Sequence, residues 1–279
     1  MLSTIIFSKN RPMQLQLLLR SIEDNFKELS DVHILYKHTS EDFKEGYEKV
    51  ISQFPYYRWI NEVNLKKDIL NIIEKIQSKF ILFMVDDEVV INDYSIKPAI
   101  DLLQTAIDVH TVSLRLHQDI TYTYTANIQS PTPNFEHRDG LLLWNWKESN
   151  PISDWGYPSC INSHLYSKIF LEYYINLLNF NTVNDLEGYL NLNRSSFKPK
   201  MACFPIAKTF NIANNLVQIG YNRYSENKEY TPENLNKYFL NDYQISTKNL
   251  YGLKKNTATG EVDYEFEKVY NKYLNFYKY

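Results

Sequence analysis

The chain has 279 residues, enough for one large domain or two small ones with a proper core. Hydrophobic residues make up 44% and charged residues 23%, the balance of an ordinary soluble globular protein. The net charge of −3 gives no electrostatic case for nucleic acid or an anionic membrane as a partner. The two cysteines lack metal-site spacing, and neither a signal peptide nor a membrane-spanning run is visible, so we expect a cytoplasmic protein.

Strand-like and helix-like segments alternate through the first hundred residues. Short β-rich runs cover residues 3–8, 32–36, 57–60 and 80–85, and helical apolar spacing covers residues 13–22, about 42–54 and 65–76. Because such alternation needs crossover connections, it predicts a parallel sheet with right-handed crossovers.

The pattern changes after residue 95. The spacing predicts helices over residues 96–107, 163–178, 185–192 and 232–240, and a strand over 111–116. Residues 118–150 look irregular, and irregular stretches of this length in a compact domain are usually functional.

The most informative motif is the apolar run 80–85, which ends in three acids, Asp86, Asp87 and Glu88. The run predicts a strand buried on both faces, so the acids fall where open α/β sheets bind ligands. Adjacent acids repel one another, and a divalent cation with oxygen ligands is the usual remedy. A cation there can in turn hold a diphosphate. The alternative is a solvated acidic turn after a core strand.

The loops after the first two strands belong to the same edge of the sheet. Ser8, Asn10 and Arg11 follow the first strand, and the Arg11 fork suits a phosphate. Alternatively, Asn10 and Arg11 cap the following helix. His38 follows the second strand, either as a contact to a nucleotide base or as an exposed turn residue.

Three further carboxylates are candidates for a general base. Asp185 and Glu187 open a predicted helix but point in different directions, so at most one is expected to serve. Both instead suit the helix dipole as stabilising acids. Asp154 lies in an aromatic stretch, whose rings either cover the apolar faces of a sugar or form a satellite core. The aromatic residues of that stretch are Trp144, Trp146, Trp155 and Tyr157.

These motifs, in this order, resemble the nucleotide-binding half of GT-A glycosyltransferases, notably the family 2-like bacterial enzymes. The residues that carry the resemblance are SKNRP (8–12) and FILFMVDDEVV (80–90). Segments 113–125, 154–167, 181–190 and 215–223 also look like family 2-like proteins, so the resemblance covers about four-fifths of the chain. The sequence departs from the family at Glu88 and Asn162, where Asp is usual.

The resemblance implies a GT-A fold, which is Rossmann-like, with a mostly parallel sheet between helices and a C-terminal helical extension. It divides the chain into a catalytic domain (1–215) and an extension (216–279). Within the catalytic domain, residues 1–110 form the nucleotide-binding half and 111–215 the acceptor-binding half.

The same resemblance implies a metal-dependent transfer of sugar from a nucleotide-diphosphate donor, most simply a UDP- or GDP-sugar. The acceptor would be a glycan or lipid-linked hydroxyl in surface polysaccharide or glycoconjugate synthesis. Asp86 and Glu88 would hold Mn²⁺ or Mg²⁺. The expected donor contacts are Ser8, Asn10, Arg11, His38, Asp86 and Asp87.

Several alternatives stay open. Glu88 and Asn162 leave room for a non-catalytic carbohydrate-binding or scaffold protein with a degenerate site. A sugar nucleotidyltransferase is disfavoured, because its loop after the first strand is normally rich in glycine and this one has none. By analogy His164 is a metal or acceptor ligand, or else a structural residue. The tail either touches the inner face of a membrane or packs on the catalytic domain, and its lysines are Lys268, Lys272 and Lys278.

Overall fold

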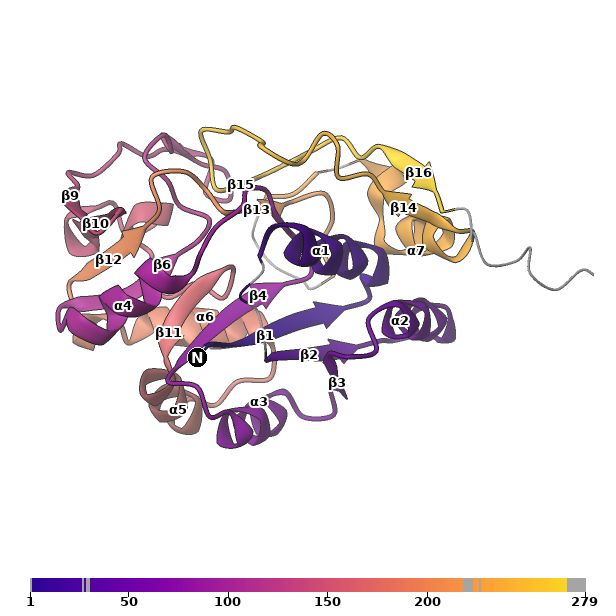
Figure 1. The fold of residues 1–279 in the computed structure, drawn as a ribbon, viewed down its shortest axis with the longest axis horizontal. Coiled ribbons are helices and arrows are strands. Elements are labelled where there is room, and N and C mark those ends of the chain that lie inside the picture. The colour runs from indigo at the N-terminus through magenta and orange to yellow at the C-terminus, as the bar shows by residue number, and fades with distance from the viewer. Residues whose placement is uncertain (1, 27, 29–30, 218–222, 226, 270–279) are drawn as a thin grey trace, which may run out of the picture.

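The computed structural model describes residues 2–26, 28, 31–217, 223–225 and 227–269, and the described residues build one large sheet between two layers of helices (Figure 1). The sheet has nine strands within these residues. In spatial order they are β3 (Arg58–Asn61), β2 (Val32–Lys37), β1 (Leu2–Lys9), β4 (Phe80–Val85), β11 (His164–Ser167), β6 (Val109–Ser113), β12 (Lys200–Cys203), β10 (Leu141–Asn145) and β9 (Glu136–Arg138).

Most strands of this sheet run in one direction. Strands β3, β2, β1 and β4 are mutually parallel, and β6 is parallel to β12. Strand β11 is antiparallel to both β4 and β6, and β10 is antiparallel to both β12 and β9. Only β11 and β10 therefore oppose the others among the described strands, which confirms the predicted α/β fold with a mostly parallel sheet.

The helices cover the two faces of the sheet. They are α1 (Pro12–Asn25), α2 (Glu41–Gln53), α3 (Leu65–Lys75), α4 (Lys97–Thr105), α5 (Lys168–Leu177), α6 (Val183–Leu192) and α7 (Pro232–Leu240). Helices α1, α2, α4 and α7 pack in one apolar cluster, and α3, α5 and α6 in another.

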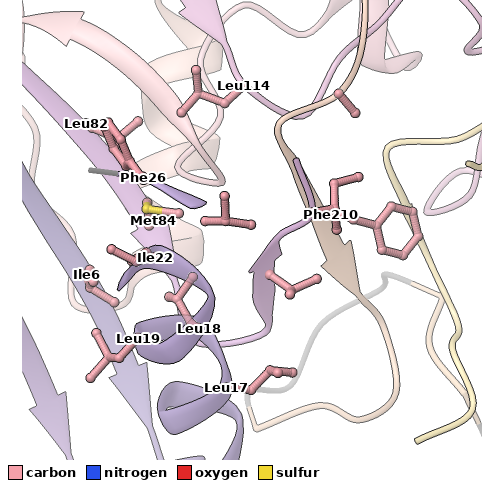
Figure 2. Close-up of a cluster of buried hydrophobic side chains, with 14 of the residues drawn as sticks. Ile6, Leu17, Leu18, Leu19, Ile22, Phe26, Leu82, Met84, Leu114 and Phe210 are labelled. Carbon is pink, nitrogen blue, oxygen red and sulfur yellow. The ribbon is translucent and has the colours of Figure 1, made fainter. Parts of the chain in front are cut away.

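Successive side chains of β1 and β4 belong alternately to the two apolar clusters. Ile6, Leu82 and Met84 face α1 (Figure 2), while Phe7 and Phe83 face the opposite layer. Successive side chains of a strand point to opposite faces, so an unbroken apolar run is what a strand buried on both faces requires. The two layers hold the carboxyl ends of β1 and β4 rigidly side by side.

Small sheets complete the fold. Strand β13 (Thr209–Ile212) pairs with β5 (Glu88–Val90) and β15 (Thr259–Gly260), so the C-terminal segment joins a sheet with the residues that follow β4. The remaining pairs are β14 (Tyr243–Ile245) with β16 (Phe266–Lys268), and β7 (Tyr122–Thr123) with β8 (Ile128–Gln129). Four 3₁₀ turns lie within the described residues, at Trp146–Glu148, Asp154–Gly156, Arg194–Ser196 and Lys228–Tyr230.

The C-terminal segment packs on the N-terminal half. Helix α7 approaches α2 at Gly46, where an added Cβ would lie 2.3 Å from the Asn236 side-chain oxygen. The Asn236 amide donates to the Asp42 carbonyl at 2.8 Å. Lys268 lies in β16, with its ammonium over the Tyr243 ring, whereas Lys272 and Lys278 fall outside the described residues. The division of the chain at residue 215 stays a prediction.

Two sequence predictions need correction. Residues 163–178 were expected to form one helix, but β11 occupies His164–Ser167 and α5 begins only at Lys168. Strand β11 is buried between β4 and β6, so it lacks the polar alternation that separates a strand from a helix. The region 118–150 is not wholly irregular, because β9 and β10 extend the main sheet there.

No helix within the described part of the chain is both long and apolar enough to cross a membrane.

Candidate active site

A cleft of about 540 Å³ opens at the carboxyl ends of β1, β2 and β4. The first half of the chain contributes the ends of these strands, and the second half contributes the loops and helix that face them. The charged lining residues are Lys9, Arg11, Lys37, Glu62, Asp86, Asp87, Arg115, Asp154, Glu187 and Arg223. The cleft thus lies where the sequence placed the ligand site, at the edge that parallel strands share.

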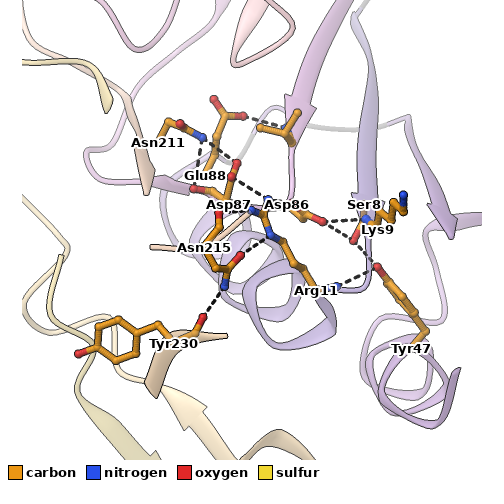
Figure 3. Close-up of polar contacts among 11 residues, drawn as sticks. Ser8, Lys9, Arg11, Tyr47, Asp86, Asp87, Glu88, Asn211, Asn215 and Tyr230 are labelled. Carbon is orange, nitrogen blue, oxygen red and sulfur yellow. Dashed lines mark hydrogen bonds and ion pairs between the residues drawn. The ribbon is translucent and has the colours of Figure 1, made fainter. Parts of the chain in front are cut away.

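Asp86 is fixed at the floor of the cleft by the loop after β1. The register of β1 with β4 pairs Phe7 with Val85, which brings Ser8 beside Asp86. One Asp86 carboxylate oxygen accepts from the Ser8 hydroxyl and from the Lys9 amide, each at 2.9 Å (Figure 3). Burial raises the pKa of Asp86, and the charge of Arg11 opposes this shift.

Arg11 joins the two cleft acids. Its Nη1 lies 3.0 Å from an Asp86 oxygen and 2.7 Å from an Asp87 oxygen. Behind it, Nε donates to the Asn215 side-chain oxygen at 2.7 Å and Nη2 donates to the Asn215 carbonyl at 2.6 Å. The other Asp87 oxygen accepts from the Asn211 amide at 2.7 Å. Burial alone would lower the pKa of Arg11, but the charges of Asp87 and Asp86 raise it.

Glu88 does not take the position that the sequence predicted. It is fully buried and does not line the cleft. One of its oxygens accepts from the Val85 amide at 3.0 Å, and the other has no hydrogen-bond partner within the described residues (Figure 3). In a continuous strand, Asp86 and Glu88 would point to the same face. A turn at residues 86–87 interrupts the strand, and Glu88 then enters β5 opposite Asn211. Burial raises the pKa of Glu88 to about 8.

The predicted metal ligands therefore do not fit one shared cation. Asp86 faces the cleft and Glu88 is buried outside it. Across the described ranges, no group of three or more His, Cys, Asp or Glu side chains is placed to hold a metal ion. The use of Mn²⁺ or Mg²⁺ stays a prediction of the sequence.

Glu187 is the carboxylate that the second half of the chain brings to the cleft. It lies on α6 and lines the cleft, with one oxygen accepting from the Ile161 amide at 2.8 Å. Burial raises the pKa of Glu187 above its ordinary value. Asp185, two residues earlier, instead completes a capping box with Thr182 at the start of α6. Of the two acids, only Glu187 is free to meet a ligand.

Asp154 also lines the cleft, but its carboxylate is committed to an ion pair. It lies 2.8 Å from Nη2 of Arg115, and both side chains are almost fully buried. Arg115 also donates to the Thr259 hydroxyl at 3.3 Å and lies 3.5 Å from the Cys160 sulfur. Because the Asp154 carboxylate is already paired with a guanidinium inside the protein, this pair is better suited to orient a ligand.

Several other predicted contacts lie away from the cleft. Asn10 adopts φ 54°, a conformation that Asn tolerates, and its side chain makes two hydrogen bonds with Thr39. His38 is not among the lining residues. His164 is fully buried in β11, and neither ring nitrogen has a partner within the described residues. Asn162 does line the cleft.

The predicted aromatic sugar platform is mostly core. Trp144 and Trp155 pack edge to face, with ring centroids 5.0 Å apart, and belong with Trp146 to a third buried cluster. Of the four aromatic residues proposed for sugar contact, only Tyr157 lines the cleft.

Sequence reasoning missed several lining residues. Lys9 and Arg223 line the cleft, and neither forms an ion pair with a carboxylate of the described residues. Arg223 lies over the Tyr124 ring, with its guanidinium carbon 4.6 Å from the ring centroid. The sequence does carry a signal for Arg115, because a lone arginine between two leucines implies a buried charge with a partner.

No model of a known protein family matches the chain. The sequence is 28% identical to the bifunctional glycosyltransferase pgtA of Dictyostelium discoideum in an alignment of 178 positions that covers 58% of the chain. The chain spans 23% of the length of that protein. This similarity confirms, for more than half of the chain, the resemblance to glycosyltransferases.

Likeness to solved structures is weak. S. aureus TarS 1-349 in complex with UDP-GlcNAc is 12% identical, with a TM-score of 0.47 over 79% of this chain and 60% of that one. A cytidylyltransferase from Leptospira borgpetersenii is also 12% identical, with a TM-score of 0.45 over 74% of this chain and 76% of that one. Neither likeness is strong enough to identify the fold.

Proposed function

We propose that the chain is a glycosyltransferase that binds a nucleotide-diphosphate sugar in the cleft. The proposal rests on one cleft that residues from both halves of the chain line. The acid-ended strand β4 supplies Asp86 and Asp87, and α6 supplies Glu187 on the facing wall. The sequence similarity to a glycosyltransferase supports this interpretation.

The donor would lie along the ends of β1, β2 and β4. Lys9 and Arg223 are suited to the diphosphate, since neither is committed to a carboxylate of the described residues. At the β2 end of the cleft, Lys37 and Glu62 form a pair at 2.8 Å. This pair offers both a donor and an acceptor to the edge of a base such as uracil or guanine.

Glu187 is suited to act as the general base. It would take the proton of the acceptor hydroxyl, whose oxygen then attacks the anomeric carbon of the donor sugar. The bond from that carbon to the diphosphate oxygen breaks, and the nucleoside diphosphate leaves with the electron pair. Such a single displacement inverts the anomeric configuration. A raised pKa brings this carboxylate closer to neutral pH, where a base is most effective.

The acceptor would enter beside Glu187. Tyr157 and Asn162 line this part of the cleft. The aromatic ring suits the apolar C–H face of a sugar, and the amide suits its hydroxyl groups. We therefore propose a glycan or a lipid-linked sugar as the acceptor, with a role in polysaccharide or glycoconjugate synthesis.

The test is turnover with a panel of UDP-, GDP-, CMP- and dTDP-sugars, each with simple oligosaccharide acceptors. The proposal predicts release of nucleoside diphosphate from one of the diphosphate donors, and loss of that release in Glu187→Gln. Release of CMP from a CMP-sugar alone would contradict a diphosphate donor. A protein that binds a nucleotide sugar but never turns it over would instead be a carbohydrate-binding or scaffold protein. Transfer of a nucleotidyl group from CTP or UTP to a sugar phosphate would identify a nucleotidyltransferase.

A further inference from the structure

The two acids of the cleft, Asp86 and Asp87, already share a cation, the guanidinium of Arg11. All four carboxylate oxygens of Asp86 and Asp87 accept hydrogen bonds from protein groups. The Arg11 Nη1 lies between the two carboxylates, within 3.0 Å of each. A bridging Mg²⁺ would need oxygen ligands at about 2.0–2.1 Å and would therefore compete for the place of this nitrogen.

Asn215 also holds Arg11 on the side away from the two acids, so displacing the guanidinium would cost free energy. The side-chain oxygen and the backbone carbonyl of Asn215 each accept a hydrogen bond from the Arg11 guanidinium. The Asn215 amide in turn donates to the Tyr230 carbonyl at 2.6 Å. Moving Arg11 aside would break four charge-assisted hydrogen bonds and leave buried groups unpaired.

We propose that the Arg11 guanidinium takes the place of a divalent cation between Asp86 and Asp87, so that the donor binds without metal. Metal-free binding of the donor rests on the proposed function. The place of Arg11 between the two acids does not. The positive charge for the diphosphate would then come from the side chains of Lys9 and Arg223, which line the same cleft.

The first test uses Mn²⁺ alone, followed by the EPR signal of the free ion and by calorimetry. Wild-type protein is expected to bind Mn²⁺ weakly or not at all. Arg11→Ala frees two adjacent carboxylates and is expected to bind Mn²⁺ at least about tenfold more tightly. That gain should vanish in the double variant Arg11→Ala with Asp87→Asn. Arg20→Ala is the matched control, because it removes an arginine from α1 outside the cleft lining.

The second test uses wild-type protein, so it stands even if Arg11→Ala fails to fold. The affinity for UDP or GDP should agree within about twofold between EDTA and excess Mn²⁺. Tight Mn²⁺ binding by the wild type that is lost in Asp87→Asn would overturn the proposal. A folded Arg11→Ala variant that gains no Mn²⁺ affinity would overturn it as well.

The two proposals fail separately. If no nucleotide binds the wild type, the proposed function fails, while the Mn²⁺ titrations still decide the role of Arg11. If nucleotide binds only with Mn²⁺, the proposed function stands and the role of Arg11 is refuted.

Discussion

Replacing Glu88 with Gln should stabilise the protein at alkaline pH. Glu88 is fully buried, and burial raises its pKa from 4.5 to about 8. A carboxyl with a higher pKa in the folded than in the unfolded state holds its proton more tightly when folded. This group therefore costs no stability below about pH 4.5, costs more as the pH rises toward 8, and costs a constant amount above that.

The size of the effect follows from the two pKa values. Between about pH 5 and pH 8, the ionisation of Glu88 should remove on the order of 3 kcal/mol of folding free energy. Gln has the shape of the protonated acid, and its carbonyl oxygen can still accept from the Val85 amide. Glu88→Gln should thus match the wild type near pH 5 and exceed its stability by about 3 kcal/mol near pH 8.

The assay is urea unfolding of wild type and Glu88→Gln at a series of pH values. Glu45→Gln is the matched control, since Glu45 is exposed on α2 and should change neither the stability nor its pH dependence. Equal pH dependence in wild type and Glu88→Gln would refute the buried, unpaired position of this carboxyl. So would a loss of stability in the variant at pH 8.

Three other substitutions test the facing wall. Glu187→Gln should lower the transfer rate about 10²- to 10⁴-fold without lowering the melting temperature, because the uncharged amide is easier to bury than the carboxylate. The wild-type kcat/KM should rise with pH through a pKa above that of an ordinary glutamate, and the exposed Glu172→Gln is the control in steady-state kinetics. Asp154→Ala leaves the buried Arg115 unpaired and should cost about 3–5 kcal/mol in urea unfolding, much of it recovered by a second change, Arg115→Met. Thr182→Ala removes a capping box and should cost about 1 kcal/mol in the same assay, and an unchanged midpoint would contradict its capping role.

The first half of the fold was predictable because its signals are local. The apolar run 80–85 has the same bounds as β4, and Pro12 opens α1 at its first position, as its fixed φ favours. Strand β11 could not be recognised in the same way, because a short strand buried between two neighbours carries no alternation.

The nucleotide side of the site was predictable where residues follow closely after a strand. Ser8, Arg11, Asp86 and Asp87 reach the cleft because parallel strands end at one edge. Asn215 bonds to Arg11 from 204 residues away, and a contact of that kind leaves no pattern in either segment. Glu88 was misplaced because two turn residues reset the alternation after β4.

Calorimetric titration of UDP and GDP shows whether the cleft binds the nucleotide part of a UDP- or GDP-sugar donor. Wild-type protein should bind one of the two, and Lys9→Ala should weaken that binding about tenfold, the loss of one charged phosphate contact. Lys67 is exposed on α3 outside the cleft lining, so Lys67→Ala should bind the nucleotide like the wild type. Binding of neither nucleotide, or equal binding by all three proteins, would contradict a donor site for a UDP- or GDP-sugar in this cleft.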